Sequence, residues 1–182
     1  MRVGFGRLII VHKLIHGTQL ESASSFTHGK SMSNDNRSPQ QSARARAQQM
    51  GLPYSGALLP KEAFELWKSS PGAQLVDVRT RAEWDWVGRI PGAVEIELLS
   101  YPGNRPNPEF MQQLAEKVAA DAPVLFICRS GGRSHNAAML ATQAGYADCY
   151  NVLEGFEGDR DPQGHRNVVG GWRASGLPWI QS

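Results

Sequence analysis

The sequence predicts an α/β protein of three layers, in which helices cover both faces of a central parallel sheet. Apolar runs of strand length alternate with helical segments from residue 60 onward, and such alternation is typical of parallel sheets. The run at 123–128 is apolar almost throughout, as expected for a strand that is buried on both faces. The 182 residues suffice for one domain with some length to spare.

The helices are predicted from their start and stop signals. Pro60 fits the first turn of a helix, Asn107 with Pro108 forms a cap and a first turn, and Gly145 ends a third helix. Trp84 and Trp86 are expected to pack beneath the turn at 90–92. Helices are expected at 60–68, 81–86, 107–120, 134–144 and, as a short piece, 172–175. Strands are expected at 73–78, 94–96, 123–128 and 148–152.

The first fifty residues differ in composition from the rest. Residues 17–50 are rich in Ser, Gln, Asn, Thr and Arg, so burial cannot offset the entropy of ordering them. Residues 1–50 hold seven basic and two acidic side chains, whereas residues 51–182 hold twelve and fifteen. We expect residues 1–50 to be disordered or poorly ordered and residues 51–182 to form the domain. The apolar cluster at 8–15 leaves a transit-like or surface-binding segment as the alternative.

Composition excludes several classes of protein. No apolar run reaches the roughly 18–20 residues of a membrane helix. Two cysteines cannot build a disulfide scaffold. The net negative charge of residues 51–182 argues against binding to a nucleic-acid backbone. We therefore expect a cytoplasmic protein with no nucleic-acid and no membrane partner.

A cysteine lies where sheet proteins of this class bind their ligands. Cys128 ends an apolar strand and is followed by Arg-Ser-Gly-Gly-Arg-Ser at 129–134 and then by a helix. The N–H groups of a glycine-rich loop, the helix dipole and two arginines all favour a thiolate over a thiol. The sequence thus predicts a reactive Cys128; the alternative is a small apolar side chain that ends a strand.

This loop resembles the active-site loop of the rhodanese family of sulfurtransferases, and four further segments support the resemblance. They are, in family order, LVDVR at 75–79, GRIPGA at 88–93, VLEG at 152–155 and GLP at 176–178. The similarity extends over about residues 54–180. It implies the rhodanese-like three-layer fold.

The resemblance also implies a mechanism in which sulfur passes through a persulfide on Cys128. The Cys128 thiolate attacks the outer sulfur of thiosulfate, or of a similar small anionic donor, and sulfite leaves. A thiophilic acceptor then takes the sulfur: cyanide in an assay, and a thiol or a sulfur-carrier protein in a cell. No metal ion and no other cofactor is implied.

Roles for particular residues follow from the same resemblance. The candidate substrate-binding residues are Arg129, Ser130, Gly131, Gly132, Arg133 and Ser134. The two arginines are expected to bind the anionic donor, and the loop N–H groups to stabilise the sulfur anion as an oxyanion hole stabilises oxygen. Asp77 and Arg79 are expected to brace the loop, with a plain structural ion pair as the alternative.

Two features depart from the family pattern. Arg89 stands where a histidine is usual, and we expect this change to affect local packing. Sixteen residues, 156–171, stand where the family passes quickly from one glycine to the next. We expect this insertion to be irregular and to lie at the same sheet edge as the Cys128 loop. It forms either a lid, with Arg166 or His165 above the cysteine, or a solvated excursion.

Other functions remain open at this stage. A cysteine phosphatase places five residues between its cysteine and its arginine, whereas four residues separate Cys128 from Arg133. Arsenate reduction needs a resolving cysteine, and Cys149 lies in an expected strand, where burial is the simpler interpretation. A non-catalytic rhodanese-like binding module is the third alternative, and the presence of Cys128 argues against it.

Overall fold

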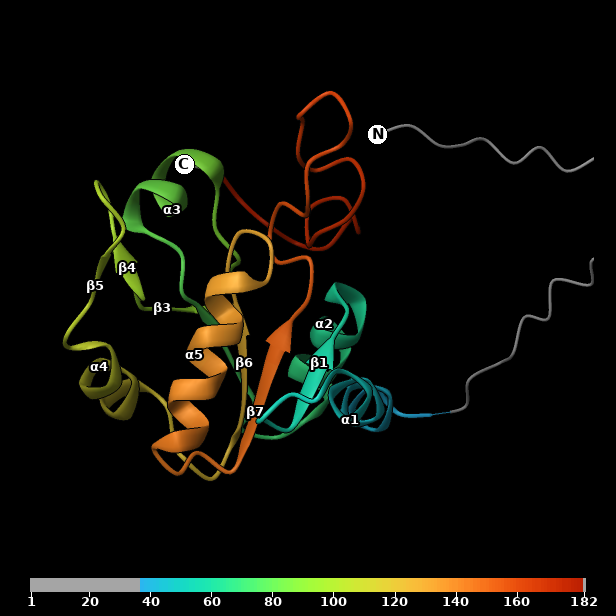
Figure 1. Ribbon diagram of the computed structural model, residues 1–182, viewed down its shortest axis with the longest axis vertical. Helices are drawn as coiled ribbons and strands as arrows, with labels where there is room; N and C mark the ends of the chain where they lie inside the picture. The colour runs from blue at the N-terminus through green and yellow to red at the C-terminus, as the bar shows by residue number, and fades with distance from the viewer. Residues whose placement is uncertain (1–36, 182) are drawn as a thin grey trace, which may run out of the picture. The chain divides into compact units, whose positions relative to one another are not determined.

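Five strands form one parallel sheet in the order β1-β7-β6-β2-β3 (Figure 1). The computed structural model describes residues 37–181, and every structural statement here refers to them. The strands are β1 (Gly56–Leu58), β2 (Gln74–Asp77), β3 (Val94–Glu95), β6 (Pro123–Ile127) and β7 (Asp148–Val152). The predicted α/β class with a central parallel sheet is confirmed.

Helices cover both faces of the sheet. They are α1 (Pro39–Met50), α2 (Pro60–Ser69), α3 (Arg81–Val87), α4 (Phe110–Lys117) and α5 (Gly132–Gln143). In Figure 1, α4 and α5 lie on one side of the sheet and α1 and α2 on the other. The short helix expected at 172–175 is instead a turn, in which the Ser175 N–H donates to the Gly171 carbonyl at 2.9 Å.

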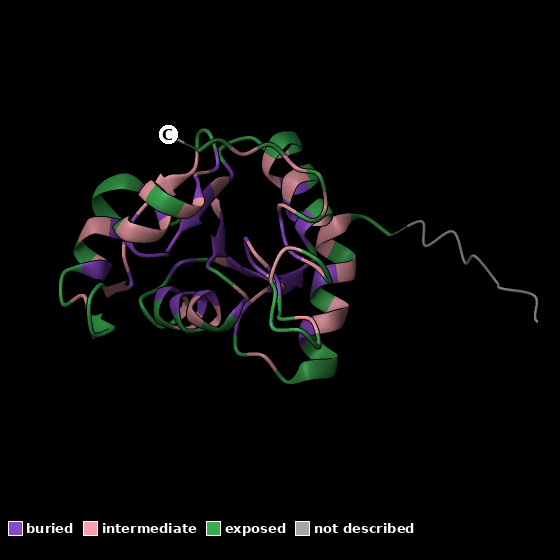
Figure 2. Ribbon diagram, turned by 90° about the horizontal axis from the view of Figure 1, so that it is seen from above, coloured by how far each residue is buried: buried purple, intermediate pink, exposed green. Residues whose placement is uncertain are grey.

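The two faces of the sheet bury two separate apolar cores. Along β6, Val124 and Phe126 pack toward α4 and α5, whereas Leu125 and Ile127 pack toward α1 and α2. Successive side chains of a strand point to opposite faces, so a continuous apolar run fits a strand that is covered on both sides. Buried positions gather on the strands and on the inner faces of the helices (Figure 2).

The ordered domain begins earlier than the sequence predicts. The expected lack of order is wrong for residues 39–50, which form α1 with a capping box between Ser38 and Gln41. Ala43 and Ala47 are buried in this helix, and Arg46 pairs with Glu62 of α2 at 3.0 Å. Small alanines let α1 lie close to β1, so the helix packs without the large apolar side chains that the prediction required. The remaining residues of that segment, 1–36, lie outside the described residues.

A small antiparallel hairpin stands apart from the main sheet. It consists of β4 (Leu99–Ser100) and β5 (Arg105–Pro106), which are not among the strands expected from the sequence. The signal was present at 102–104, where Pro, Gly and Asn follow one another, because these residues are favoured in turns. This hairpin matters because its connecting turn lines the pocket described below.

Arg89 holds the end of α3 to the sheet. Its guanidinium donates to the carboxylates of Asp85 and Glu95, and its backbone pairs with Ile180 near the C-terminus. The contacts of Arg89 are thus local, to α3, to β3 and to the C-terminal segment.

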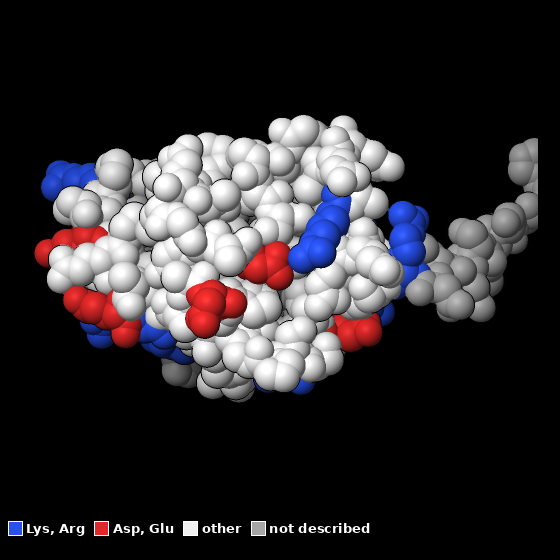
Figure 3. Space-filling view, turned by 90° about the horizontal axis from the view of Figure 1, so that it is seen from below, with Lys and Arg blue, Asp and Glu red and all other residues white. Residues whose placement is uncertain are grey.

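The end of the molecule opposite the cysteine carries scattered charges of both signs. Figure 3 views the amino ends of the strands, where neither acidic nor basic side chains gather in a patch. Between residues 37 and 181, no helix combines the length and the apolar character that crossing a membrane requires.

Candidate active site

Cys128 lies at the carboxyl edge of the sheet, directly after the central strand β6. Its side chain is buried, with a relative exposure of 1%. The Sγ atom accepts hydrogen bonds from the Gly131 N–H and from the Ser134 hydroxyl, each at 3.2 Å. Both donors stabilise negative charge on sulfur, so the loop is built to hold a sulfur anion.

The chain that follows β7 packs against the back of this loop. The Phe156 N–H donates to the Cys128 carbonyl at 2.7 Å, and the Glu157 N–H donates to the Arg129 carbonyl at 2.9 Å. Gly155 makes this approach possible, because a Cβ at this position would lie 2.4 Å from the Cys128 carbonyl oxygen. The loop conformation therefore depends on a glycine from another part of the chain.

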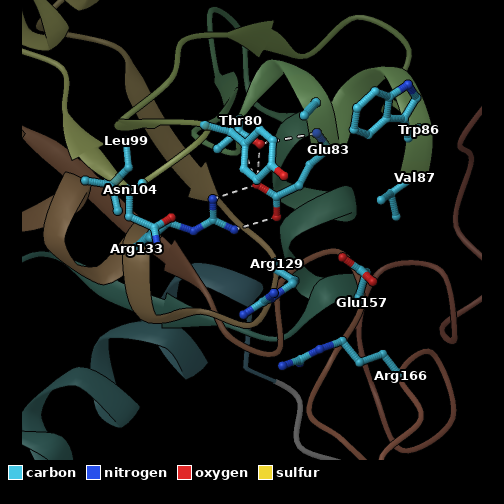
Figure 4. A pocket seen from close by; sticks show the side chains of 13 residues that line it. Thr80, Glu83, Trp86, Val87, Leu99, Asn104, Arg129, Arg133, Glu157 and Arg166 are labelled. Atoms are coloured by element: carbon cyan, nitrogen blue, oxygen red, sulfur yellow. Dashed lines mark hydrogen bonds and ion pairs between the residues drawn. The ribbon is translucent and has the colours of Figure 1, made fainter.

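Arg133 is turned toward α3. Its Nη1 and Nη2 atoms donate to the two carboxylate oxygens of Glu83 at 2.7 and 2.6 Å (Figure 4). Both side chains are less than one-fifth exposed, at 19% and 18%. The guanidinium that the sequence analysis assigned to donor binding is thus already paired in this structure.

The same pairing governs the ionisation of Glu83. Burial disfavours the charged carboxylate and by itself would raise the Glu83 pKa. Hydrogen bonds from Arg133 and from the Thr80 N–H, together with the positive charge of Arg133, have the larger effect and lower this pKa to about 2. Burial likewise opposes the Arg133 charge, and the Glu83 carboxylate overcomes this and raises the Arg133 pKa. The pair is therefore fully ionised at neutral pH.

Asp77 and Arg79 form a buried ion pair at the end of β2. Arg79 Nη2 donates to Asp77 Oδ2 at 2.6 Å and to the Gly88 carbonyl at 2.8 Å. The Arg79 guanidinium carbon lies 3.9 Å from the centre of the Phe156 ring. Because the Phe156 N–H bonds to the Cys128 carbonyl, Arg79 is linked to the cysteine through one intervening residue.

The other candidate residues of the loop are Ser130, Gly131, Gly132 and Ser134. Gly131 adopts φ +94° and precedes α5, and Gly132 is exposed as the first residue of that helix. Ser130 is half-buried. The Ser134 oxygen also lies 3.1 Å from the Gly131 carbonyl oxygen, so its single proton is shared between this carbonyl and the sulfur.

A pocket of about 740 Å³ opens beside the loop. The Cys128 side chain does not line it, but Arg129 and Arg133, the two arginines that follow the cysteine, do. The lining residues come from α3, the β4–β5 hairpin, the loop and the insertion: Thr80, Ala82, Glu83, Trp86, Val87, Leu99, Tyr101, Gly103, Asn104, Arg129, Arg133, Glu157 and Arg166. This volume is within the range of pockets that bind small organic molecules.

The insertion at 156–171 lies against the Cys128 loop, where the sequence places it, and forms neither helix nor strand. It closes on itself, because a Cβ at Gly158 would lie 2.2 Å from the Gly170 carbonyl oxygen and one at Gly171 would lie 2.5 Å from the Gly158 nitrogen. Arg166 reaches the pocket, whereas His165 is 74% exposed and lies beside Asp161. Of the two residues considered for a lid, Arg166 alone lines the pocket.

Trp86 is placed differently from its prediction. Trp84 is buried, at 7% exposure, but Trp86 is 72% exposed and stands at the pocket. Residues two apart on a helix point in different directions, so the two tryptophans could not both face the core. The spacing of two residues was therefore the sequence signal that Trp86 would be exposed. The pairing of Glu83 with Arg133 had no such local signal.

The second cysteine has no part in this site. Cys149 is fully buried in β7, and burial raises the pKa of its thiol. This supports the structural interpretation and removes the resolving residue that arsenate reduction would need near the loop.

Comparison with known proteins gives consistent matches. The family model of the rhodanese-like domain matches residues 60–161. A crystal structure of Rv0390 from M. tuberculosis is 43% identical, with a TM-score of 0.66, and the match covers 71% of this chain and 99% of that chain. The thiosulfate sulfurtransferase GlpE of Pseudomonas aeruginosa is 32% identical over 103 residues, 55% of this chain and 79% of that protein. An uncharacterised protein of Rickettsia conorii is 36% identical over 121 residues, 65% of this chain and 91% of that protein.

The motif order in the sequence, the parallel sheet with its cysteine loop and these matches agree. The chain belongs to the rhodanese-like family of sulfurtransferases.

Proposed function

We propose that the protein moves sulfane sulfur from thiosulfate, or from a similar small anionic donor, to a thiophilic acceptor through a persulfide on Cys128. The observation that carries this proposal is the pair of donors on the Cys128 sulfur, the Gly131 N–H and the Ser134 hydroxyl. The match to a thiosulfate sulfurtransferase from Pseudomonas aeruginosa supports the donor.

The chemistry consists of two displacements at sulfur. In the first, the Cys128 thiolate attacks the outer sulfur of thiosulfate, a new S–S bond forms, and sulfite leaves with the electrons of the broken S–S bond. In the second, an acceptor such as cyanide attacks the outer sulfur of the persulfide. The bond to Cys128 breaks, thiocyanate leaves, and the Cys128 thiolate is restored.

The placement of charged groups suits a sulfur donor better than a phosphate ester. A phosphatase loop needs its arginine to face the tetrahedral phosphate, whereas both terminal nitrogens of Arg133 bond to Glu83. Arg129 is exposed, and its side chain forms no hydrogen bond or ion pair with any residue from 37 to 181. We assign the first contact with the anionic donor to Arg129.

Mass spectrometry after incubation with thiosulfate tests the proposal. We expect the wild-type protein to gain the mass of one sulfur atom and to form thiocyanate with cyanide. Cys149→Ser is the matched control and should retain both properties, because Cys149 pairs with Val124, at the opposite end of β6 from Cys128. Cys128→Ser loses both. Equal thiocyanate formation by the wild type and Cys128→Ser would refute the proposal.

A further inference from the structure

We propose that Arg166 selects carboxylate-bearing thiols as sulfur acceptors, by binding the acceptor's carboxylate while its sulfur reacts with the persulfide. This inference rests on the proposed function and names the acceptor class for that same site. Arg166 belongs to the insertion at 156–171 rather than to the Cys128 loop, so the residue that would choose the acceptor is separate from the reacting group.

The structure fixes Arg166 at the pocket. Its Nη1 atom donates to the Gly158 carbonyl, and no residue from 37 to 181 bonds to its other guanidinium N–H groups, which can therefore bind a ligand. In Figure 4, the Arg166 and Arg129 side chains extend in the same direction across the pocket. Arg166 is half-buried, so a carboxylate that binds it is only partly screened by water.

The charges around the pocket favour an anionic ligand. Arg133 and Glu83 neutralise each other. Arg129, Arg166 and Glu157 then remain, and among the described residues none of these three side chains takes part in an ion pair. The surplus is one positive charge, which matches one carboxylate.

The apolar walls favour an organic acceptor over a small inorganic ion. Trp86 and Tyr101 line the pocket although they are 72% and 65% exposed, and Val87 and Leu99 line it too. A pocket of about 740 Å³ exceeds what thiosulfate or cyanide can fill. Carbon and sulfur atoms of a thiol can contact these walls while its carboxylate meets Arg166.

The transfer balances without any further reagent. The thiol loses its proton to solvent, and the thiolate attacks the outer sulfur of the Cys128 persulfide. A new S–S bond forms in the acceptor, the bond between the two sulfurs on Cys128 breaks, and Cys128 leaves as a thiolate. The product is the acceptor's persulfide, so sulfur is passed on with no net oxidation or reduction.

The experiment compares two acceptors of nearly the same size, N-acetylcysteine and its amide, of which only the first carries a carboxylate; each variant is compared with the wild type on the same acceptor. For each, kcat/KM is measured with the wild type, Arg166→Gln and Arg160→Gln. Arg160 is the matched control because it lies in the same insertion, is exposed and does not line the pocket. We expect Arg166→Gln to lower kcat/KM about tenfold for N-acetylcysteine and to leave the amide nearly unchanged. Arg160→Gln should leave both values unchanged.

Two results would overturn the inference. Equal loss for both acceptors in Arg166→Gln would mean that Arg166 acts on the fold or on the persulfide, and no loss would mean that it meets no carboxylate. Turnover of cyanide by the same variants reports on the proposed function separately. If the wild type fails with cyanide and with both thiols, the proposed function fails, and the inference fails with it.

Discussion

The Glu83 carboxylate decides where the Arg133 guanidinium lies. Two short hydrogen bonds hold the arginine against α3, at 2.7 and 2.6 Å. In Glu83→Gln the arginine keeps its charge but loses its counter-ion in a partly buried position. We expect the free energy of unfolding at pH 7 to fall by about 1.5–3 kcal/mol, the scale of hydrogen bonds to charged groups. Urea denaturation measures it. The control is Glu157→Gln in the same pocket, because the Glu157 side chain forms no ion pair with any residue from 37 to 181.

The stabilisation from Glu83 depends on pH in a defined direction. Its pKa lies at about 2 in the folded protein, below the ordinary value of 4.5, so the folded state favours the ionised form. The stabilisation by Glu83 is fully present at pH values above the pKa of the unfolded state. It is lost as the pH falls toward the lower pKa of the folded state. The difference in stability between wild type and Glu83→Gln should therefore shrink between about pH 5 and pH 2. A difference that stays constant over this range would contradict the ion pair.

Gly155 combines an unusual backbone angle with a close contact, and the two effects can be separated. At φ +61°, any side chain is strained, and a Cβ would also lie 2.4 Å from the Cys128 carbonyl oxygen. Gly164 adopts φ +89°, but nothing lies within 4 Å of its Cβ position. We expect Gly155→Ala to lose about 2 kcal/mol more stability than Gly164→Ala, and to lose sulfur transfer as the loop shifts. Equal losses in thermal unfolding would mean that only backbone strain matters.

At the scale of elements, α1 completes one face of the sheet. Its buried alanines pack at β1, and Arg46 joins it to Glu62 of α2. We expect a chain that starts at residue 52 to be less stable by about 2 kcal/mol or more than one that starts at residue 36. The urea midpoints of the two chains give this difference. Identical midpoints would show that α1 adds nothing to the fold.

The elements that the sequence predicts well are those with strong local signals. Strand β7 occupies the predicted residues 148–152, and α2 begins at the predicted Pro60, because an apolar run and a first-turn proline mark them. Helix α1 and strand β1 were missed because alanine, glycine and a three-residue strand give little periodicity. Both elements are held in place by packing against distant parts of the chain.

The candidate site also contains features that local sequence predicts and one that it does not. The position of Cys128 after β6 and the donors on its sulfur follow from a contiguous motif, so local sequence suffices for them. The partner of Arg133 lies fifty residues away in the chain, on another helix. Long-range pairing of this kind depends on the packing of elements, which no local motif encodes.

At the scale of the whole molecule, charge is unevenly distributed along a chain whose formal net charge is +2. Residues 51–182 carry more acidic than basic residues, yet the pocket has surplus positive charge. An exposed arginine is screened by salt, and the screening length is about 3 Å at 1 M salt against 10 Å at 0.1 M.

We therefore expect KM for thiosulfate to rise about threefold or more between low salt and about 0.5 M salt. In Arg129→Gln this rise should be smaller, because the exposed charge that attracts the donor is gone. The measurement is KM in sodium chloride at a series of concentrations. A salt dependence that is the same in both proteins would assign donor attraction to another group.

The close contact of Gly158 with Gly170 at the base of the insertion bears on how the sequence of this segment can vary. The chain enters and leaves the excursion at Gly158 and Gly170, whose backbones touch, so its two ends stay in place whatever lies between them. Replacement of the residues between these glycines leaves the Cys128 loop and its hydrogen bonds untouched. If the proposed function holds, we therefore expect variants with a different segment between these glycines to change in acceptor preference and to keep sulfur transfer through Cys128.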